Sequence, residues 1–256
     1  MKAMILAAGL GTRLRPLTDA RPKALVEING RTLLEITLTR LRSFGVNEVI
    51  INVHHFADLV VDYLKSHNNF DMRIEISREE DLLLDTGGGL KKASWFFQEN
   101  ARRSLPATRH SPPEPFLLHN VDVISTIDLS RMLQFHKEHG ALATLAVQSR
   151  ESSRLLLFND QLELVGRASG TGIPACTPSA AHSSLALAFS GIHIISPRLF
   201  PLLTEDSVFS IIDAYLRLAA QGEKILALRA DEYYWRDLGR PSDLSQAALD
   251  LQQGMI

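Results

Sequence analysis

Short apolar runs alternate along the chain with segments whose hydrophobic residues recur every three or four positions. A run of about four to eight apolar residues predicts a buried strand, and the longer spacing predicts an amphipathic helix. Predicted strands occupy residues 2–8, 46–53, 72–77, 116–120, 141–148, 154–158, 161–165, 185–195 and 224–228. Predicted helices occupy residues 32–44, 56–66, 128–139, 208–220 and 243–252. This alternation indicates an α/β protein with a mostly parallel central sheet and helices on both faces.

Three stretches interrupt the alternation. The glycines at 87–89 predict a turn that opens a helix ending near Phe97. Residues 99–115 are polar and rich in proline, and residues 168–184 are rich in small and polar residues, so we expect a surface loop and a mobile loop. No shift in composition marks a domain boundary. We therefore expect a single domain over residues 1–256 with a less regular second half.

The overall composition argues against several classes of binding partner. With 27 basic and 29 acidic residues the net charge is -2, which argues against general nucleic-acid binding. No apolar stretch reaches the roughly 18 residues of a membrane span. A single cysteine excludes an internal disulfide and multi-cysteine metal sites, and it favours a cytoplasmic location. The sequence carries no signal for an oligomeric state.

The first predicted strand runs into a glycine-rich segment. Gly9 and Gly11 let the backbone approach a ligand and direct N–H groups at its oxygens, and Arg13 adds a cation. Position 14 is Leu14, which rules out both the dinucleotide fingerprint and the P-loop. Lys23 follows in a stiff, proline-flanked stretch and supplies a second cation. The segment therefore predicts an anion site of another kind.

The motif L-A-A-G-x-G-T-R-L-x-P-L-T at residues 6–18, followed by P-K-x-L at 22–25, resembles the signature of sugar-1-phosphate nucleotidyltransferases, or nucleotide-sugar pyrophosphorylases. Weaker matches lie at residues 85–89, 120–122, 189–192 and 235–239. The resemblance implies a Rossmann-like, glycosyltransferase-A-like fold. It also implies Mg²⁺-dependent transfer of a nucleotidyl group from an NTP to a sugar 1-phosphate, with release of pyrophosphate.

The resemblance also implies residue roles. Residues of about 1–125 would bind the nucleotide, and residues of about 126–256 would bind the sugar phosphate. The implied catalytic residues are Arg13, Lys23, Asp122 and Asp237, of which the two aspartates would hold Mg²⁺. The implied nucleotide-binding residues are Leu6, Ala8, Gly9, Gly11, Thr12, Arg13, Glu80 and Gly88. The implied sugar-phosphate-binding residues are Asn120, Ser190 and Gly191.

Three features depart from the family pattern. Val121 stands where many relatives have glycine before the first metal aspartate. The stretch 168–185 lacks the lysine that often holds the sugar phosphate, so Arg154 or Arg167 is expected to replace it. Because the sequence ends at Ile256, we expect no hexapeptide-repeat β-helix of the kind that many long relatives append.

Within the family, the compact length and the D-T-G-G-G segment resemble uridylyltransferases for N-acetylmuramate 1-phosphate and guanylyltransferases for mannose or heptose 1-phosphate. UTP is slightly favoured as the donor. A cytidylyltransferase acting on a phosphorylated alcohol such as phosphocholine is one alternative. A non-catalytic nucleotide-binding regulator with the same fold is another. The sequence alone identifies neither the base of the NTP nor the sugar of the acceptor.

Overall fold

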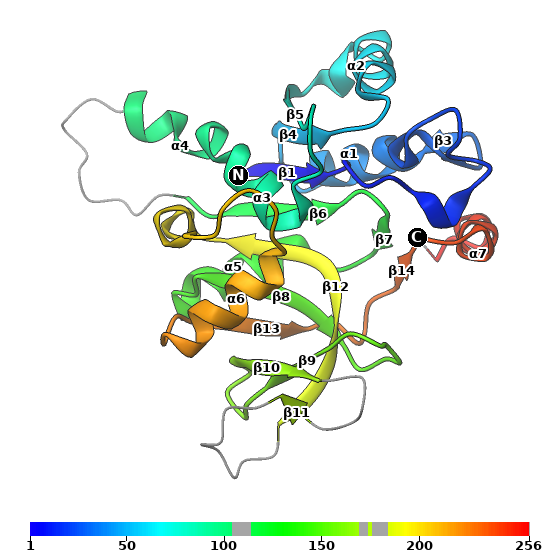
Figure 1. The fold of residues 1–256 in the computed structure, drawn as a ribbon. Helices are drawn as coiled ribbons and strands as arrows, with labels where there is room; N and C mark the ends of the chain where they lie inside the picture. The colour runs from blue at the N-terminus through cyan, green and yellow to red at the C-terminus, as the bar shows by residue number, and fades with distance from the viewer. Residues whose placement is uncertain (104–113, 169–173, 176–183, 256) are drawn as a thin grey trace.

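The computed structural model describes residues 1–103, 114–168, 174–175 and 184–255 of the chain, and a large sheet crosses it (Figure 1). The strands of this sheet are β1 (Lys2–Leu6), β4 (Glu48–Val53), β5 (Arg73–Arg78), β6 (Phe116–Asn120), β8 (Ala143–Gln148), β9 (Leu155–Phe158), β10 (Leu164–Ala168), β11 (Pro174–Ala175), β12 (Leu185–Ile195) and β13 (Ile225–Arg229). Their order is β11-β10-β9-β12-β6-β1-β4-β5, with β8 pairing β12 and β13. The sheet therefore includes strands from both halves of the chain.

Two small sheets lie outside the large one. They are formed by β2 (Glu27–Ile28) with β3 (Arg31–Thr32), and by β7 (Val123–Ser125) with β14 (Trp235–Asp237). The described helices are α1 (Leu33–Ser43), α2 (Ala57–Ser66), α3 (Asp85–Lys92), α4 (Ser94–Arg103), α5 (Leu129–His139), α6 (Ile211–Ala220) and α7 (Pro241–Gln252). Side-chain caps fix where several helices begin. The Thr32 side chain accepts from the Glu35 N–H, and Asp128 accepts from the first turn of α5.

The strands near the amino terminus are parallel. β1 pairs in parallel with β4 and β6, and β4 pairs in parallel with β5, so their carboxyl ends meet at one edge. β12 runs antiparallel to β6, so the residues just before Ile192 pass the carboxyl end of β6. These pairings confirm the predicted α/β fold. They also place the segments that follow β1 and β6 side by side.

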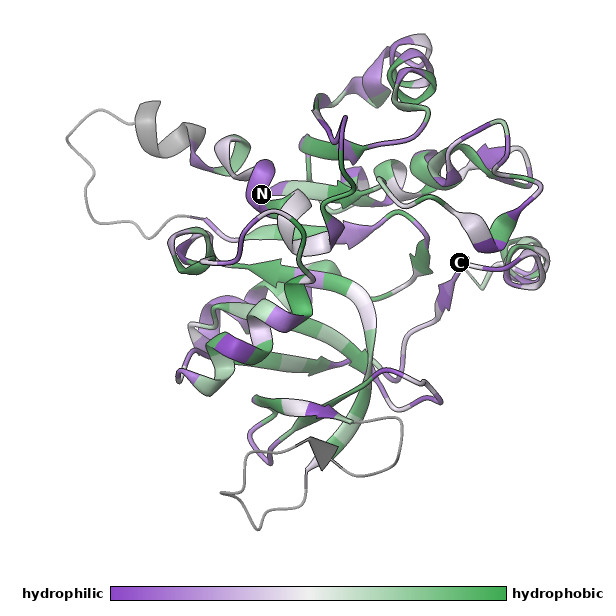
Figure 2. Cartoon of the chain, viewed as in Figure 1, coloured by the Kyte–Doolittle hydropathy of each residue, from purple (hydrophilic) through white to green (hydrophobic). Residues whose placement is uncertain are grey.

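Both faces of the sheet are covered. Ala3 and Ile5 belong to a core with residues of α1, α2 and α5, whereas Met4 packs with residues of α3, α4 and α6. Successive side chains of a strand point to opposite faces, so an unbroken apolar run is what a sheet covered on both sides requires. Figure 2 shows this distribution, with hydrophobic central strands and hydrophilic residues on outer helices and loops.

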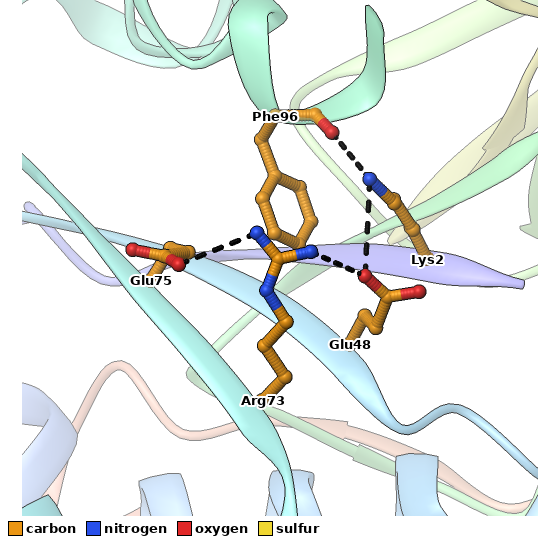
Figure 3. A network of polar contacts seen from close by, with 5 residues as sticks. All are labelled: Lys2, Glu48, Arg73, Glu75 and Phe96. Atoms are coloured by element: carbon orange, nitrogen blue, oxygen red, sulfur yellow. Dashed lines mark hydrogen bonds and ion pairs between the residues drawn. The ribbon is translucent and has the colours of Figure 1, made fainter. Parts of the chain in front are cut away.

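A network of charges lies at the amino-terminal edge of the sheet (Figure 3). The Lys2 Nζ donates to the Phe96 carbonyl at 2.6 Å and lies 3.8 Å from a Glu48 oxygen. Arg73 pairs with Glu48 at 2.8 Å and with Glu75 at 3.4 Å. These contacts hold β1, β4, β5 and α4 together at the amino-terminal ends of the parallel strands. The network at this edge therefore stabilises the fold.

The prediction of a turn at the three glycines is wrong, because they lie inside α3 and are buried. A Cβ at Gly88 would lie 2.1 Å from the Ser207 carbonyl oxygen, and one at Gly87 would lie 2.2 Å from the Phe209 ring. Close packing against residues 207–209 therefore requires glycine here, and it outweighs the low helix propensity of that residue.

The predicted loop at 99–115 is also partly wrong, because α4 continues to Arg103. Residues 104–113 and most of the predicted loop at 168–184 lie outside the described residues. Within that second stretch, residues 174–175 form β11. Among the described residues, no helix is both long and apolar enough to span a membrane.

Three buried histidines predict a loss of stability in mild acid. Burial lowers the pKa of His193 to about 3, and it lowers the pKa of His119 and of His136 to about 4. In the unfolded chain these groups take up a proton near pH 6.5. Their contribution is therefore complete above pH 6.5 and is lost as the pH falls toward 4, by about 2 kcal/mol per histidine at pH 5.

Urea unfolding at pH 5.0 and 7.5 checks this expectation. His193→Gln should reduce the difference in unfolding free energy between the two pH values, because one of the three groups no longer titrates. His67→Gln, at an exposed position after α2, should keep the full difference. An equal difference in His193→Gln and in the unmodified protein would show that His193 is not responsible.

Candidate active site

The two predicted metal ligands lie next to each other. Asp122 follows β6 and directly precedes β7, and β14 pairs antiparallel with β7 so that Asp237 is opposite Val123. The Leu238 N–H donates to the Asp122 carbonyl at 2.8 Å. A short strand pair thus brings together two aspartates that are far apart in the sequence.

Lys23 joins this pair of aspartates. It begins a 3₁₀ turn at Lys23–Leu25 after Pro22, and only 7% of the residue is exposed. Its Nζ lies 2.5 Å from the Asp122 Oδ2. A buried ammonium is stable only beside an opposite charge, so this contact fixes both side chains.

The ionised carboxylate of Asp237 is disfavoured in this site, chiefly because it is buried. Burial raises the pKa of Asp237, and the neighbouring charge of Asp122 raises it further, while Lys23 and Arg13 act in the opposite direction. The Gly239 N–H donates to its Oδ1 at 2.8 Å. Two neighbouring carboxylates, one of which raises the pKa of the other, are suited to share a divalent cation.

The glycine-rich loop packs against the segment that carries Lys23. Gly11 has a positive φ of 63°, and a Cβ there would lie 2.9 Å from the Thr18 Cγ2 and 3.2 Å from the Lys23 Cβ. The Thr18 hydroxyl donates to the Gly11 carbonyl at 2.9 Å. At Gly9, no described heavy atom lies within 4 Å of the Cβ position, so this part of the loop faces open space.

Arg13 connects the loop with the aspartates. It lies, exposed, in the 3₁₀ turn at Thr12–Leu14. A Cβ at Gly239 would lie 2.5 Å from the Arg13 Nη2 and 2.5 Å from the Asp237 Oδ1. The guanidinium and the carboxylate therefore share the space above Gly239, and the predicted loop and metal residues face each other.

On the predicted nucleoside side, sequence reasoning missed a buried polar pair. The Asn52 side chain accepts from the Ala7 N–H at 2.8 Å and donates to the Glu79 Oε1 at 2.7 Å. The Glu79 Oε2 accepts from the Leu84 N–H at 2.8 Å. The pair links the end of β1, which carries Leu6 and precedes Ala8, to the start of α3. An asparagine within the apolar strand at 46–53 was the available signal.

The other predicted nucleoside residues lie in contrasting surroundings. Glu80 is exposed, whereas its neighbour Glu79 is buried. Gly88 is buried in α3 against the Ser207 backbone, and its N–H donates to the Phe209 carbonyl at 3.3 Å. Their roles toward a base stay predictions.

The predicted sugar-side residues meet where β6 ends beside the middle of β12. Gly191 has a positive φ of 74°, and a Cβ there would lie 2.9 Å from the Asn120 Nδ2. Ser190 is fully buried, and its hydroxyl has no hydrogen-bond partner among the described residues. Its carbonyl accepts from the Trp235 Nε1 at 2.7 Å. The structure therefore places these residues next to the strand that carries Asp237.

Valine before Asp122 does not disturb the site. Val121 is buried, its N–H donates to the Leu6 carbonyl at 3.1 Å, and its backbone is outside the left-handed region. The conformational freedom of glycine is therefore not needed at this position.

The role of the two arginines expected to replace the family lysine stays a prediction, and a third arginine lies near Asp237. Arg167 forms an ion pair with Asp213 at 3.0 Å, and Arg154 is exposed. Arg150, which sequence reasoning missed, is half-buried and lies over the Trp235 ring at 3.7 Å from its centroid. Burial lowers the pKa of Arg150, and the charge of Asp237 raises it. Its neighbours come from distant segments, so no local motif marks it.

An α/β sheet whose first strand leads into a glycine-rich anion loop, opposite two carboxylates, defines an enzyme that acts on phosphate groups of a nucleotide. The chain belongs to the nucleotidyl transferase family, whose sequence model matches residues 2–155, more than half of its length. It is a nucleotidyltransferase, as the resemblance of its motifs implied.

Curated relatives cover nearly the whole chain. It is 33% identical over 247 residues to the N-acetylmuramate alpha-1-phosphate uridylyltransferase of Caulobacter vibrioides, with 93% of this chain and 92% of that protein aligned. It is 29% identical to the mannose-1-phosphate guanylyltransferase 1 of Arabidopsis thaliana, with 95% of this chain but 62% of that protein covered.

Solved structures agree on the fold. A UDP-glucose pyrophosphorylase complexed with UDP-glucose superposes with a TM-score of 0.75 at 19% identity, over 99% of this chain and 98% of that one. The inositol-1-phosphate CTP transferase from T. maritima gives a TM-score of 0.71 at 16% identity, over 99% and 95%. At these identities the likeness concerns the fold alone, and it confirms the expected Rossmann-like, glycosyltransferase-A-like architecture.

Proposed function

We propose that this nucleotidyltransferase moves a nucleotidyl group from an NTP to a sugar 1-phosphate, releases pyrophosphate, and depends on Mg²⁺. The observation that carries the proposal is the convergence of Asp122, Asp237, Lys23 and Arg13 beside the glycine-rich loop. Cations and carboxylates at one point suit a reaction between two phosphate anions, which need their charges neutralised and their reacting atoms aligned.

The chemistry requires no general base. An oxygen of the sugar phosphate, already ionised at neutral pH, forms the new bond to the α-phosphorus while the bond to the departing pyrophosphate breaks. In this proposal Arg13 holds the departing pyrophosphate beside the glycine loop, whose backbone N–H groups add further donors. Lys23, held by Asp122, adds positive charge at the transferring phosphate.

The two aspartates fit a bound Mg²⁺. In the described ranges no group of three or more His, Cys, Asp and Glu side chains is arranged to hold a metal. Magnesium usually takes one or two protein carboxylates and completes its octahedron with water and phosphate oxygens. Asp122 and Asp237 match that requirement, and the ion would offset the negative charge that the triphosphate brings.

We propose UTP as the donor and an N-acetylmuramate-type sugar 1-phosphate as the first acceptor to test. The support is the uridylyltransferase of Caulobacter vibrioides, which aligns over 92% of its own length. The undisturbed backbone at Val121 favours a working enzyme over a non-catalytic regulator. The single cysteine still predicts a cytoplasmic location.

Pyrophosphate release by the purified full chain tests the proposal. Each of UTP, GTP, CTP and dTTP is paired with N-acetylmuramate, mannose and glucose 1-phosphates and with phosphocholine, with Mg²⁺ or with EDTA. We expect the highest rate with UTP and N-acetylmuramate 1-phosphate, and none with EDTA. A preference for CTP and phosphocholine would support the cytidylyltransferase. Nucleotide binding without turnover of any pair would support the regulator.

A further inference from the structure

Arg150 is held rigidly at the edge of the candidate site. It follows β8, and its Nη2 donates to the Phe189 carbonyl of β12 at 2.7 Å. The guanidinium lies 3.7 Å from the centroid of the Trp235 ring, and the Trp235 Nε1 is itself bound to the Ser190 carbonyl. A cation fixed by a backbone oxygen and an aromatic face keeps its charge in one place.

In this arrangement one N–H group of the Arg150 guanidinium has no hydrogen-bond acceptor among the described residues. This group is the Nε–H, and it is buried. An unpaired buried donor is unfavourable unless a ligand completes it. The buried Ser190 hydroxyl, next to the carbonyl that Trp235 contacts, is unpaired as well within the described part of the chain.

Arg150 and Arg13 reach the neighbourhood of Asp237 from different elements of the fold. Trp235 and Asp237 are two residues apart on β14, so their side chains point to the same face of the strand. Arg13 reaches Asp237 over Gly239 from the glycine loop, whereas Arg150 approaches over Trp235 from β8 and β12. A displacement at phosphorus needs the nucleophile and the leaving group on opposite sides.

We propose that Arg150 binds the phosphate of the sugar 1-phosphate acceptor and positions it for attack. This inference rests on the proposed function, because that function supplies the acceptor. Its guanidinium meets the acceptor phosphate on the side of β12, while Arg13 meets the pyrophosphate on the side of the loop. Arg150 thus takes the role expected of Arg154 or Arg167.

Steady-state kinetics of Arg150→Gln test the inference. Losing one charged contact to phosphate should raise the KM for the acceptor by about 10- to 100-fold. The KM for the NTP and the kcat at saturating acceptor should change by less than about threefold. Arg150→Lys should recover only part of the loss, because lysine keeps the charge but not the fork. Arg154→Gln, the exposed arginine four residues on, should keep the acceptor KM.

Three results would overturn the inference: an unchanged acceptor KM in Arg150→Gln, an equal rise in both KM values, or a rise in the acceptor KM of Arg154→Gln instead.

A second readout does not need turnover. In a Trp95→Phe background Trp235 is the single tryptophan, and its fluorescence reports the ring under Arg150. Inorganic phosphate should change this signal, and Arg150→Gln should weaken its binding at least about tenfold.

The two readouts separate the inference from the proposed function. If no substrate pair turns over but phosphate binds Trp95→Phe through Arg150, the proposed function fails and the anion site stands. If turnover occurs and neither the acceptor KM nor phosphate binding depends on Arg150, the function stands and the inference fails. A phosphate titration that leaves Trp235 fluorescence unchanged also counts against Arg150.

Discussion

Asp237→Asn should lower kcat by about 10²- to 10³-fold or more, without unfolding the protein. Asparagine keeps the shape of the side chain and an oxygen that can accept from the Gly239 N–H. What it removes is one of the two negative charges proposed to hold Mg²⁺. Raising the Mg²⁺ concentration should recover part of the activity if the ion binds more weakly in the variant.

Although kcat should fall in Asp237→Asn, the free energy of unfolding of this variant should stay equal or rise. Burial and the charge of Asp122 raise the pKa of Asp237, which means that the fold disfavours the ionised carboxylate. In urea at pH 7.5 without Mg²⁺ and nucleotide, Asp237→Asn should therefore be at least as stable as the unmodified protein. Asp62→Asn, at an exposed position on α2, is the matched control and should change neither quantity. Full activity of Asp237→Asn at ordinary Mg²⁺ would remove Asp237 from the site.

Much of the fold could be predicted from hydrophobic periodicity. The run that forms β4 is buried from Val49 to Val53, as a short apolar strand covered on both faces requires. The failure at the three glycines has a tertiary cause. Residues 207–209 pack so closely against α3 that side chains cannot fit, and nothing near residue 87 in the sequence indicates this contact.

The residues of the candidate site also fall into those that the sequence could place and those that depend on contacts between distant segments. The loop at 9–13 and Lys23 belong to one continuous segment, so a local motif could place them together. The approach of Asp237 to Asp122 depends on the three-residue pairing of β14 with β7, and only the family resemblance pointed to it. Arg150 has neither kind of signal, because it owes its position to a contact between distant strands. The asparagine within the apolar run at 46–53 was a signal for Asn52, but its pairing with Glu79 depends on the alignment of β4 with β5.

Partly buried polar contacts explain why these positions are fixed. Arg40 in α1 donates at 2.7 Å to the Ser125 hydroxyl of β7 and also donates to the Ile127 carbonyl. The Tyr234 hydroxyl of the β14 segment donates to the Asp250 Oδ2 in α7 at 2.5 Å. Both strands of the pair that carries the aspartates are thus tied to helices, and a catalytic geometry needs that kind of second support.

Arg13→Ala should reduce kcat by about 10²-fold or more while changing the acceptor KM by less than about threefold. The guanidinium lies beside the Gly239 backbone and Asp237, at the end of the glycine loop, where it can stabilise charge that develops on the departing pyrophosphate. Such an interaction is stronger in the transition state than in the ground state, so its loss appears in kcat.

Single-turnover and steady-state assays with saturating NTP measure this effect, and two further variants define it. Arg13→Lys keeps the charge without the planar fork and should fall between the alanine variant and the unmodified enzyme. Arg15→Ala is the matched control, since Arg15 lies two residues on, is mostly exposed and pairs with Asp19 at 3.3 Å, so its kcat should stay within about twofold. If Arg13→Ala instead raised the acceptor KM and left kcat unchanged, Arg13 would belong to the acceptor side. The opposed roles of Arg13 and Arg150 around Asp237 would then have to be exchanged.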